Sequence, residues 1–306
     1  MDYDYIFDEL EIRTDPFALC ELRGACDLGL GRDASATLHY ILSGEGEISI
    51  RGRPPLKVAR GSLVLIPALQ SHVLHSFGSV RDPLPDCKPA ALKLAHLLKV
   101  SVNATPQSGQ LTALCAHVGV SLRGASNLID LIREPLVESI SKDSGMERLV
   151  SSLLFEVSHP TLGSAAMTRA ILLQAVIEML RVRLKQQDNA FHWMTALRDT
   201  SVWNALQLML DAPGDPHTVE TLAASVGMSR STFAKRFSDA YGSGPMELLR
   251  DLRLRQAGTL LKTTDLPVKR IAQLVGFSSR SAFSRMFDAK TGLSPRAFRK
   301  ERTPTV

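Results

Sequence analysis

The sequence of 306 residues has few cysteines, few aromatic residues and no long apolar run. Four cysteines are too few for a disulfide framework in a chain of this length, which favours a reducing compartment. The apolar stretches extend over only a few residues, so we expect no membrane-spanning helix. The chain begins Met-Asp-Tyr-Asp-Tyr, which is acidic where a secretory or mitochondrial signal carries positive charge. These features predict a cytoplasmic protein with no membrane partner.

Charge is unevenly distributed along an otherwise ordinary globular composition. Apolar residues make up 44% and charged residues 22%, which excludes a disordered chain, a collagen-like fibre and a coiled-coil rod. Residues 201–306 carry 16 basic and 9 acidic side chains, a net charge of +7. Residues 1–200 carry 20 basic and 22 acidic side chains, a net charge of −2. The basic third is expected to bind a polyanion, with a merely solvated basic face as the alternative.

The last hundred residues contain one unit written twice. The first copy covers residues 218–245 and the second covers residues 267–295. Up to the turn, equivalent residues are 49 apart, as Gly227 and Gly276 are; beyond it they are 50 apart. The second copy therefore has one added residue, which we place at the start of its second helix.

Each copy reads as a helix, a turn with glycine, and a second helix. The glycine supplies a left-handed residue where the first helix ends, and Ser229 and Ser278 are the expected N-caps of the next helix. That second helix has phenylalanines four apart on one face and polar or basic residues on the other. This is the helix-turn-helix unit, whose second helix enters the major groove. Two helical hairpins that simply pack together are the alternative. The apolar face of the first helix comprises Val219, Leu222, Ala223 and Val226.

Residues 201–306 resemble the DNA-binding domain of the AraC/XylS family of bacterial transcription regulators. The most specific match is residues 271–287, Ile-Ala-Gln-Leu-Val-Gly-Phe-Ser-Ser-Arg-Ser-Ala-Phe-Ser-Arg-Met-Phe, continued by Gly-Leu-Ser-Pro-Arg-Ala-Phe-Arg at 292–299. The resemblance implies two helix-turn-helix modules joined by a long helix at about residues 246–261. Both recognition helices would then enter successive major grooves on one face of promoter DNA.

The family's base-contacting positions fall on two sets of three residues in this sequence. Arg280 and Arg285 are the expected guanine contacts, because a guanidinium can bind O6 and N7 together. Other cations are expected on phosphates, where they position the domain without reading sequence. The implied base contacts are Ser231, Ala234, Lys235, Arg280, Ser281 and Arg285, and the implied phosphate contacts are Arg236, Arg253 and Lys290.

Residues 15–124 change to short alternating apolar runs broken by glycine, proline and aspartate, which is typical of an all-β domain. Residues 37–42 and 47–51 are predicted to form two strands joined by a turn at Gly44-Glu-Gly-Glu. Further strands are expected at 56–58, 62–66, 72–75 and 115–122. Residues 81–110 include a possible short helix at 90–98.

This β region resembles the cupin barrel that precedes the DNA-binding domain in one AraC-type subfamily. The resemblance covers about residues 5–125 and rests on stretches beginning at Phe17, His39 and Gly61. Metal cupins have a His-x-His pair, a carboxylate and a later histidine, whereas this chain has only His39 and His72. Two imidazoles make a poor site for a divalent metal, so we expect no metal and no cofactor. The candidate effector pocket comprises His39, His72, His75, Arg51, Arg53 and Arg60.

Between barrel and DNA-binding domain the sequence predicts a helical linker. Helices are expected at 127–134, 146–157 and 165–186, with a break at 159–163. The last is amphipathic and either packs on the barrel or forms a homodimer interface. Its apolar stripe comprises Leu173, Val176, Ile177, Leu180 and Leu184.

The cysteines have no Cys-x-x-Cys spacing, which argues against a zinc ribbon or a thioredoxin-type site. Cys20 and Cys115 lie in predicted strands that are expected to be near each other. Some cupin-type members of the family are thiol sensors of reactive chlorine or related oxidants, and the resemblance places a cysteine at Cys20. Buried apolar fillers are the alternative.

The sequence therefore predicts an α+β protein of three parts: a cupin-like sensor at 1–125, a helical linker at 126–200 and a double helix-turn-helix domain at 201–306. Its expected function is regulation of transcription, as an activator because most of the family are, without enzymatic activity. Expected partners are promoter DNA, a second copy of the chain, RNA polymerase and a small-molecule or oxidant effector. The alternatives are a metal-dependent cupin enzyme fused to a DNA-binding domain, and an unregulated architectural DNA-binder.

Overall fold

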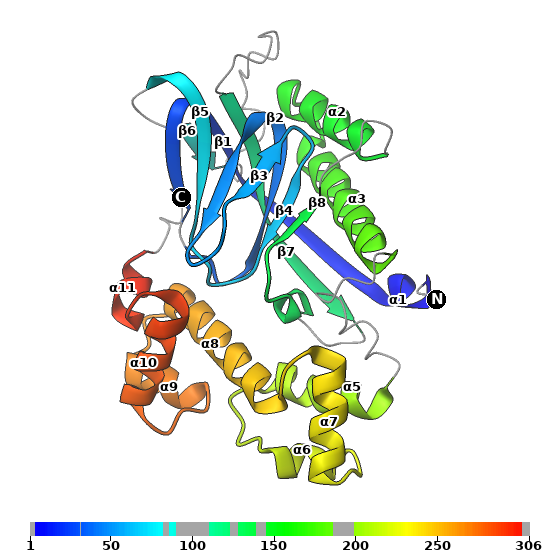
Figure 1. Cartoon of the computed structure of the whole chain (residues 1–306), viewed down its shortest axis with the longest axis vertical. Helices are drawn as coiled ribbons and strands as arrows, with labels where there is room; N and C mark the ends of the chain where they lie inside the picture. Colours follow the sequence, from blue (N-terminus) through cyan, green and yellow to red (C-terminus); the bar gives the residue numbers. More distant parts are fainter. Residues whose placement is uncertain are drawn as a thin grey trace.

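The computed structural model describes residues 4–30, 32–81, 86–89, 110–122, 128–138, 145–185 and 199–301. The predicted helix at 90–98 lies outside these residues. Figure 1 shows a β-structure with two helices beside it and a group of helices toward the C-terminal end. Across the described helices, none has the length and apolar character that crossing a membrane requires.

The N-terminal part is a closed antiparallel barrel, which confirms the predicted cupin fold. Two long strands, β1 (Leu10–Leu30) and β2 (Ala36–Ile50), both pair with β5 (His72–Arg81) and with β7 (Gln110–Leu122). This ring of pairings closes the sheet, and short strands extend its edges. The short strands are β3 (Leu56–Ala59), β4 (Leu63–Ile66), β6 (Asp86–Pro89) and β8 (Leu136–Glu138).

The prediction of two strands joined by a turn at residues 44–47 was wrong, because β2 runs through this stretch without interruption. Its first half pairs with β4 and its second half pairs with β3. Gly44 makes the bend possible: its φ is +80°, and a Cβ there would overlap the carbonyl oxygen of Gln110. Two glycines in a β-rich run thus bend one strand from one side of the barrel to the other.

Side chains of β2 alternate between two apolar clusters. Ile41 belongs to the cluster inside the barrel, which also includes Cys20 and Cys115. Leu38, Tyr40 and Leu42 belong instead to the cluster formed with the linker helices. Both faces of this half of β2 are therefore buried, so its polar residue His39 is also completely enclosed.

The linker helices pack against the barrel within the chain. Helix α2 (Gly145–Ser158) and helix α3 (Ser164–Lys185) match the predicted helices, and α3 packs on α2 and β1. Val176 and Leu180, from the stripe considered for a homodimer, are buried in this intrachain core. The first predicted linker helix is instead a single 3₁₀ turn, Leu128–Leu131, although residue 127 lies outside the described part.

The C-terminal part is all-helical and contains both predicted modules. Each module's recognition helix buries two phenylalanines on its inner face. Helix α8 joins the modules as one continuous helix, as Figure 1 shows, and contributes leucines to the cores on both sides. The helices are α5 (Thr200–Asp211), α6 (Val219–Ser225), α7 (Arg230–Tyr241), α8 (Pro245–Thr263), α9 (Val268–Leu274), α10 (Arg280–Thr291) and α11 (Pro295–Lys300); a short α1 (Asp4–Glu9) precedes the barrel.

The caps of the recognition helices correct the predicted alignment of the two copies. The Ser229 hydroxyl caps α7, as expected, and accepts the backbone N–H of Thr232. In the second copy the cap is Ser279, whose hydroxyl accepts the N–H of Ala282, and not Ser278. The added residue therefore lies in the turn before α10, and the two recognition helices correspond at a constant offset of 50.

The second module also packs directly on the barrel. Leu69 is 2% exposed and shares an apolar cluster with α8, α10 and α11. A Cβ on Gly258 of α8 would lie 2.6 Å from Cδ2 of Leu69, so any larger residue there would displace the Leu69 side chain. Arg32 adds polar contacts by donating to the carbonyl oxygen of Thr291 and pairing with Glu301 at 3.2 Å. Barrel and second module thus share a core.

Candidate nucleic-acid interface

The two recognition helices present polar residues opposite their buried phenylalanines. In α7, Phe233 and Phe237 are fully buried, whereas Ser231 and Lys235 are exposed and Ala234 is half-buried. The spacing of these residues on a 3.6-residue helix puts the predicted contacts on one outward face. That face carries one small apolar residue and one unpaired cation, because Lys235 has no salt-bridge partner among the described residues.

The second recognition helix presents a more basic face. Arg280, Ser281 and Arg285 of α10 are all exposed. Within the part of the chain that the structure describes, neither arginine lies within 4.0 Å of a carboxylate oxygen, so both guanidinium groups point to solvent unpaired. Fully hydrated, unpaired arginines on a major-groove-sized helix are suited to bidentate hydrogen bonds with guanine.

The three predicted phosphate contacts lie in different environments. Arg236 Nε lies 2.8 Å from Asp199 Oδ2, and Lys290 Nζ lies 3.1 Å from Asp251 Oδ1. Arg253 donates from Nε and Nη2 to the carbonyl oxygens of Pro213 and Asp215, each at 2.7 Å, and burial lowers the pKa of its guanidinium. Arg253 therefore fastens the loop between α5 and α6 to α8, a structural role that its place in the sequence did not reveal.

The barrel interior contains a buried chain of four polar side chains. Cys20 Sγ lies 3.3 Å from Cys115 Sγ, and Cys115 Sγ lies 3.2 Å from Nδ1 of His39. His39 Nε2 in turn lies 2.6 Å from Nε2 of His72, whose Nδ1 lies 3.3 Å from the carbonyl oxygen of Gln70. All four side chains are at most 3% exposed. The predicted redox pair and two predicted pocket residues are thus in direct contact.

The direction of the hydrogen bonds among these four side chains determines which ring nitrogen of each histidine carries the proton. The carbonyl oxygen of Gln70 can only accept, so His72 carries its proton on Nδ1 and accepts at Nε2. His39 then donates from Nε2 and accepts the Cys115 thiol proton at Nδ1. Burial, together with the nearby His72, holds the pKa of His39 well below 6.5, and burial lowers the pKa of His72 to about 4. Both imidazoles are therefore neutral bases.

The other predicted pocket residues lie away from these four hydrogen-bonded side chains. His75 pairs with Asp27 on the barrel surface, at 2.6 Å, and Arg60 is exposed in the turn after β3. Arg53 pairs with Glu134, and Arg51 faces the end of α10 across a cavity of about 390 Å³. The predicted pocket residues do not form one site.

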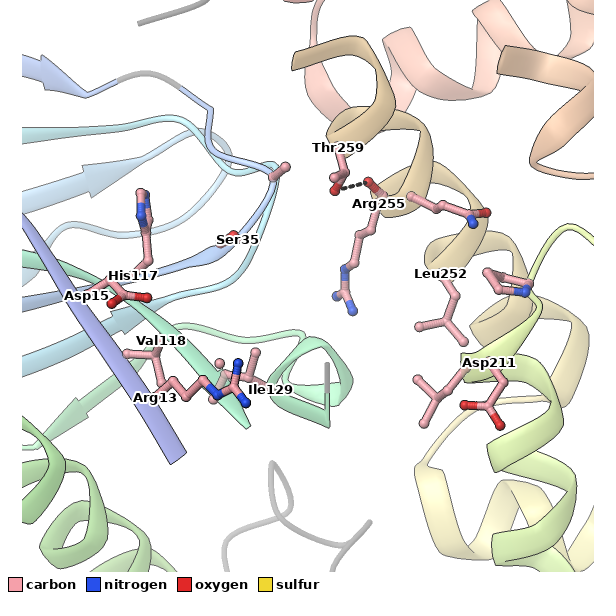
Figure 2. Close-up of a pocket in the computed structure, with 15 residues that line it drawn as sticks. Arg13, Asp15, Ser35, His117, Val118, Ile129, Asp211, Leu252, Arg255 and Thr259 are labelled. Carbon is pink, nitrogen blue, oxygen red and sulfur yellow. Dashed lines mark hydrogen bonds between the residues drawn. The ribbon is translucent and has the colours of Figure 1, made fainter. Parts of the chain in front are cut away.

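A larger cavity, of about 570 Å³, lies between barrel and α8 and was not predicted. Figure 2 shows Arg255 extending from α8 into the space between this helix and the barrel, where Asp15 and His117 line the opposite side. Arg255 is 4% exposed, and Asp211 and Arg13 supply further charges to the lining. The lining comes from residues more than 200 positions apart in sequence, so no local motif signals it. Among the described residues, no group of three or more histidine, cysteine or acidic side chains is arranged to hold a metal ion.

Comparisons with known proteins agree with both halves of this architecture. A family described as "Cupin" matches residues 4–185, and one described as "Helix-turn-helix domain" matches residues 222–301. The chain belongs to the cupin-type AraC/XylS family of DNA-binding transcription regulators. The cupin match extends through α2 and α3, whereas the boundary between sensor and linker at residue 125 stays a prediction.

Individual relatives show how far this likeness extends. The HTH-type transcriptional regulator AlkR of Acinetobacter baylyi is 27% identical over 97% of this chain and 98% of its own length. The RCS-specific HTH-type transcriptional activator RclR of Escherichia coli is 40% identical, over 31% of this chain and 34% of its own length. The solved DNA-binding domain of AdpA in complex with a target DNA is 37% identical, covering 32% of this chain and 89% of that one at a TM-score of 0.32.

Proposed function

We propose that this regulator is a cytoplasmic, non-enzymatic activator that reads promoter DNA with both recognition helices. The observation that carries the proposal is the pair of outward polar faces on α7 and α10, held apart by one rigid helix. Arg280, Arg285 and Ser281 would contact bases from α10, and Ser231, Ala234 and Lys235 would contact bases from α7. Arg236, Arg253 and Lys290 are proposed to lie near phosphates, and the activator role implies contact with RNA polymerase.

Fluorescence anisotropy with the full-length protein tests this reading. The probe is a duplex that the wild-type protein selects from a randomised library, with a scrambled duplex of equal length as the control. We expect the selected duplex to bind at least a thousandfold more tightly, which is within the range for specific regulators. Affinity for both duplexes should fall steeply as salt rises. Equal affinity for the two duplexes would instead support an architectural DNA-binder.

We further propose that the barrel senses an oxidant through Cys20 and Cys115. His39 is placed to accept the Cys115 proton as the sulfur reacts, because its Nδ1 lies 3.2 Å from Cys115 Sγ. With hypochlorous acid as the oxidant, Cys115 Sγ attacks chlorine while its proton passes to His39, which gives a sulfenyl chloride and hydroxide, and the hydroxide takes that proton to form water. The Cys20 thiol then displaces chloride and releases a proton, forming a disulfide. The sulfur atoms, 3.3 Å apart, must approach by about 1.3 Å to reach bonding distance.

The matched variants for this sensor are Cys20→Ser, Cys115→Ser and Cys26→Ser. Cys26 is also a buried cysteine of β1, so its variant controls for the loss of a thiol from the barrel. Binding to the selected duplex is measured before and after one equivalent of hypochlorous acid. We expect a tenfold or larger change in the wild type and in Cys26→Ser, and none in the other two variants. An unchanged wild type would favour a small organic effector in one of the two cavities.

A homodimer is proposed as the DNA-bound form, because family regulators with paired modules act on paired sites. Val176 and Leu180 of the α3 stripe are buried within the chain, whereas Leu173, Ile177 and Leu184 are half-buried, so this half-buried part of α3 is the proposed contact between protomers. Sedimentation of the protein with and without the selected duplex tests the stoichiometry. Metal analysis of the purified protein tests the remaining alternative, since one equivalent of bound metal would revive a cupin enzyme.

A further inference from the structure

The capping geometry makes Arg230 the structural counterpart of Arg280. Each arginine is the first residue of its recognition helix, directly after the capping serine. Each is exposed, and both helices have twelve residues and end at a left-handed glycine. Residues in the first turn of a recognition helix are the ones that reach base edges. An offset of 49, which matches Ser229 to Ser278, pairs Arg230 with Ser279 and so hides this equivalence.

The surroundings of the two arginines differ in the sign of one charge. Arg230 Nε lies 3.0 Å from Oε1 of Glu220, in the first turn of α6. At the equivalent position of α9, the second module has Lys269, which is exposed. The position whose side chain pairs with Arg230 in the first module is therefore acidic, and its equivalent in the second module is basic.

Glu220 is itself fixed in place. Its backbone N–H and the Thr218 side chain lower the pKa of the Glu220 carboxyl group, and the nearby Arg230 charge lowers it further. The carboxylate is thus ionised at neutral pH and held at the helix N-terminus, where the helix dipole favours an anion. An arginine paired through Nε still has N–H groups on Nη1 and Nη2 to donate to a further partner. Two parallel N–H groups are what a guanine edge accepts.

We propose that Arg230 is a further base-reading residue of the first module, and that Glu220 is a positioning residue that orients its guanidinium. The inference rests on the proposed function, since it assumes that α7 enters the major groove. It assigns the first module a guanine contact that Ala234 and Ser231 do not provide. Glu220 also repels phosphates near the rim of the groove, so it lowers affinity for DNA of every sequence while the Arg230 contact favours one.

The test uses the full-length protein and a panel of duplexes, in which each base pair of the selected site is replaced in turn. Arg230→Lys keeps the charge and removes the planar fork, so it separates base reading from phosphate contact. We expect Arg230→Lys to lose roughly tenfold to a hundredfold in affinity for the selected duplex. Its affinity for the scrambled duplex and its salt dependence should stay at the wild-type values. In the panel, discrimination should vanish at one guanine and persist elsewhere.

Glu220→Gln tests the positioning role, and Lys269→Gln is its matched control in the second module. We expect Glu220→Gln to bind the scrambled duplex several-fold more tightly and to discriminate less at the same guanine. Lys269→Gln should weaken binding to all duplexes and leave the Arg230-dependent position unchanged. A Glu220→Gln profile with undiminished discrimination at that guanine would overturn the positioning role.

Failures of this inference and of the proposed function are distinguishable. If wild-type protein binds selected and scrambled duplexes equally, the proposed function fails. If wild-type protein discriminates and Arg285→Ala loses one position of the panel, DNA reading stands. An Arg230→Lys profile identical to wild type would then overturn only the role given to Arg230. An Arg230→Ala variant that loses affinity equally on every duplex would make Arg230 a phosphate contact and overturn the inference too.

Discussion

The barrel and the DNA-binding region place their reactive groups in opposite surroundings. In the barrel, His39, His72 and Cys115 are enclosed and hydrogen-bonded to one another. On the recognition helices, Arg280 and Arg285 stand exposed, and no carboxylate of the described chain lies within salt-bridge distance of them. Burial makes the first set sensitive to proton and electron transfer, and exposure makes the second set sensitive to salt and to the sequence of DNA. The barrel should therefore be perturbed most directly by protons and oxidants, and the recognition helices by salt and by the sequence of the DNA.

The largest expected effect is on the free energy of unfolding, and it concerns a residue buried where the two regions meet. Leu69→Ala removes a side chain that is buried between barrel and second module, so we expect a loss of about 2–5 kcal/mol in the free energy of unfolding. The control is Leu274→Ala, whose side chain is 41% exposed and should cost far less. Urea unfolding monitored by circular dichroism gives both values. Equal small losses would mean that the two regions do not share a core.

A second variant isolates the barrel through its pH dependence. Burial lowers the pKa of His72 to about 4 in the folded chain, whereas its ordinary value is 6.5. Between these values the unfolded chain binds a proton that the folded chain excludes, so stability falls as pH drops from 6.5 to 4, by roughly 3 kcal/mol from this group. His72→Gln should flatten that fall, and His159→Gln, at an exposed position, should not. Unfolding free energies measured at several pH values test this prediction. Parallel pH curves for His72→Gln and the wild type would show that His72 does not cause the loss of stability at low pH.

A third variant isolates the DNA-binding region. Arg285→Ala should cost about 1–3 kcal/mol on the selected duplex and leave the unfolding free energy unchanged, because the side chain is exposed and unpaired. Its discrimination should disappear at one or two base pairs. Anisotropy on the duplex panel measures both effects. A loss that is uniform over the panel would place Arg285 on a phosphate.

The smallest expected effect is on the stability of the second module, and it concerns the N-cap of α10. Ser279→Ala should destabilise the second module by about 1 kcal/mol, since the hydroxyl caps α10. Ser278→Ala, one residue earlier, should be close to neutral because Ser278 does not cap the helix. Thermal unfolding of the two variants side by side provides the measurement, and the reverse ranking would reassign the cap.

The sequence was most informative where function depends on local spacing. Glycine turns, paired phenylalanines and the repeat itself predicted both modules and the joining helix, because each rests on residues within one or two turns of one another. It was least informative where residues distant in sequence meet. The cavity beside Arg255, the Leu69 contact and the hydrogen bonds of Arg253 all join segments far apart in the chain.

Two predictions failed for a physical reason that a sequence does not show. Glycine favours a tight turn and a bend within a strand for the same reason, its freedom at positive φ, so Gly44 alone did not distinguish them. Arg51 and Arg53 were assigned to a candidate ligand pocket because they cluster on one predicted hairpin. In the structure that hairpin faces the end of α10 instead.

Helix α8 has a consequence for the genome that carries this gene. Its 19 residues form an unbroken rod about 28 Å long, somewhat shorter than one turn of DNA. The length of α8 thus sets the distance between the two recognition helices. Single base substitutions can raise or lower the affinity of a promoter for this regulator gradually. A single inserted base between its two subsites, in contrast, rotates one of them away from the protein, so regulated promoters should tolerate substitutions in this interval and purge insertions.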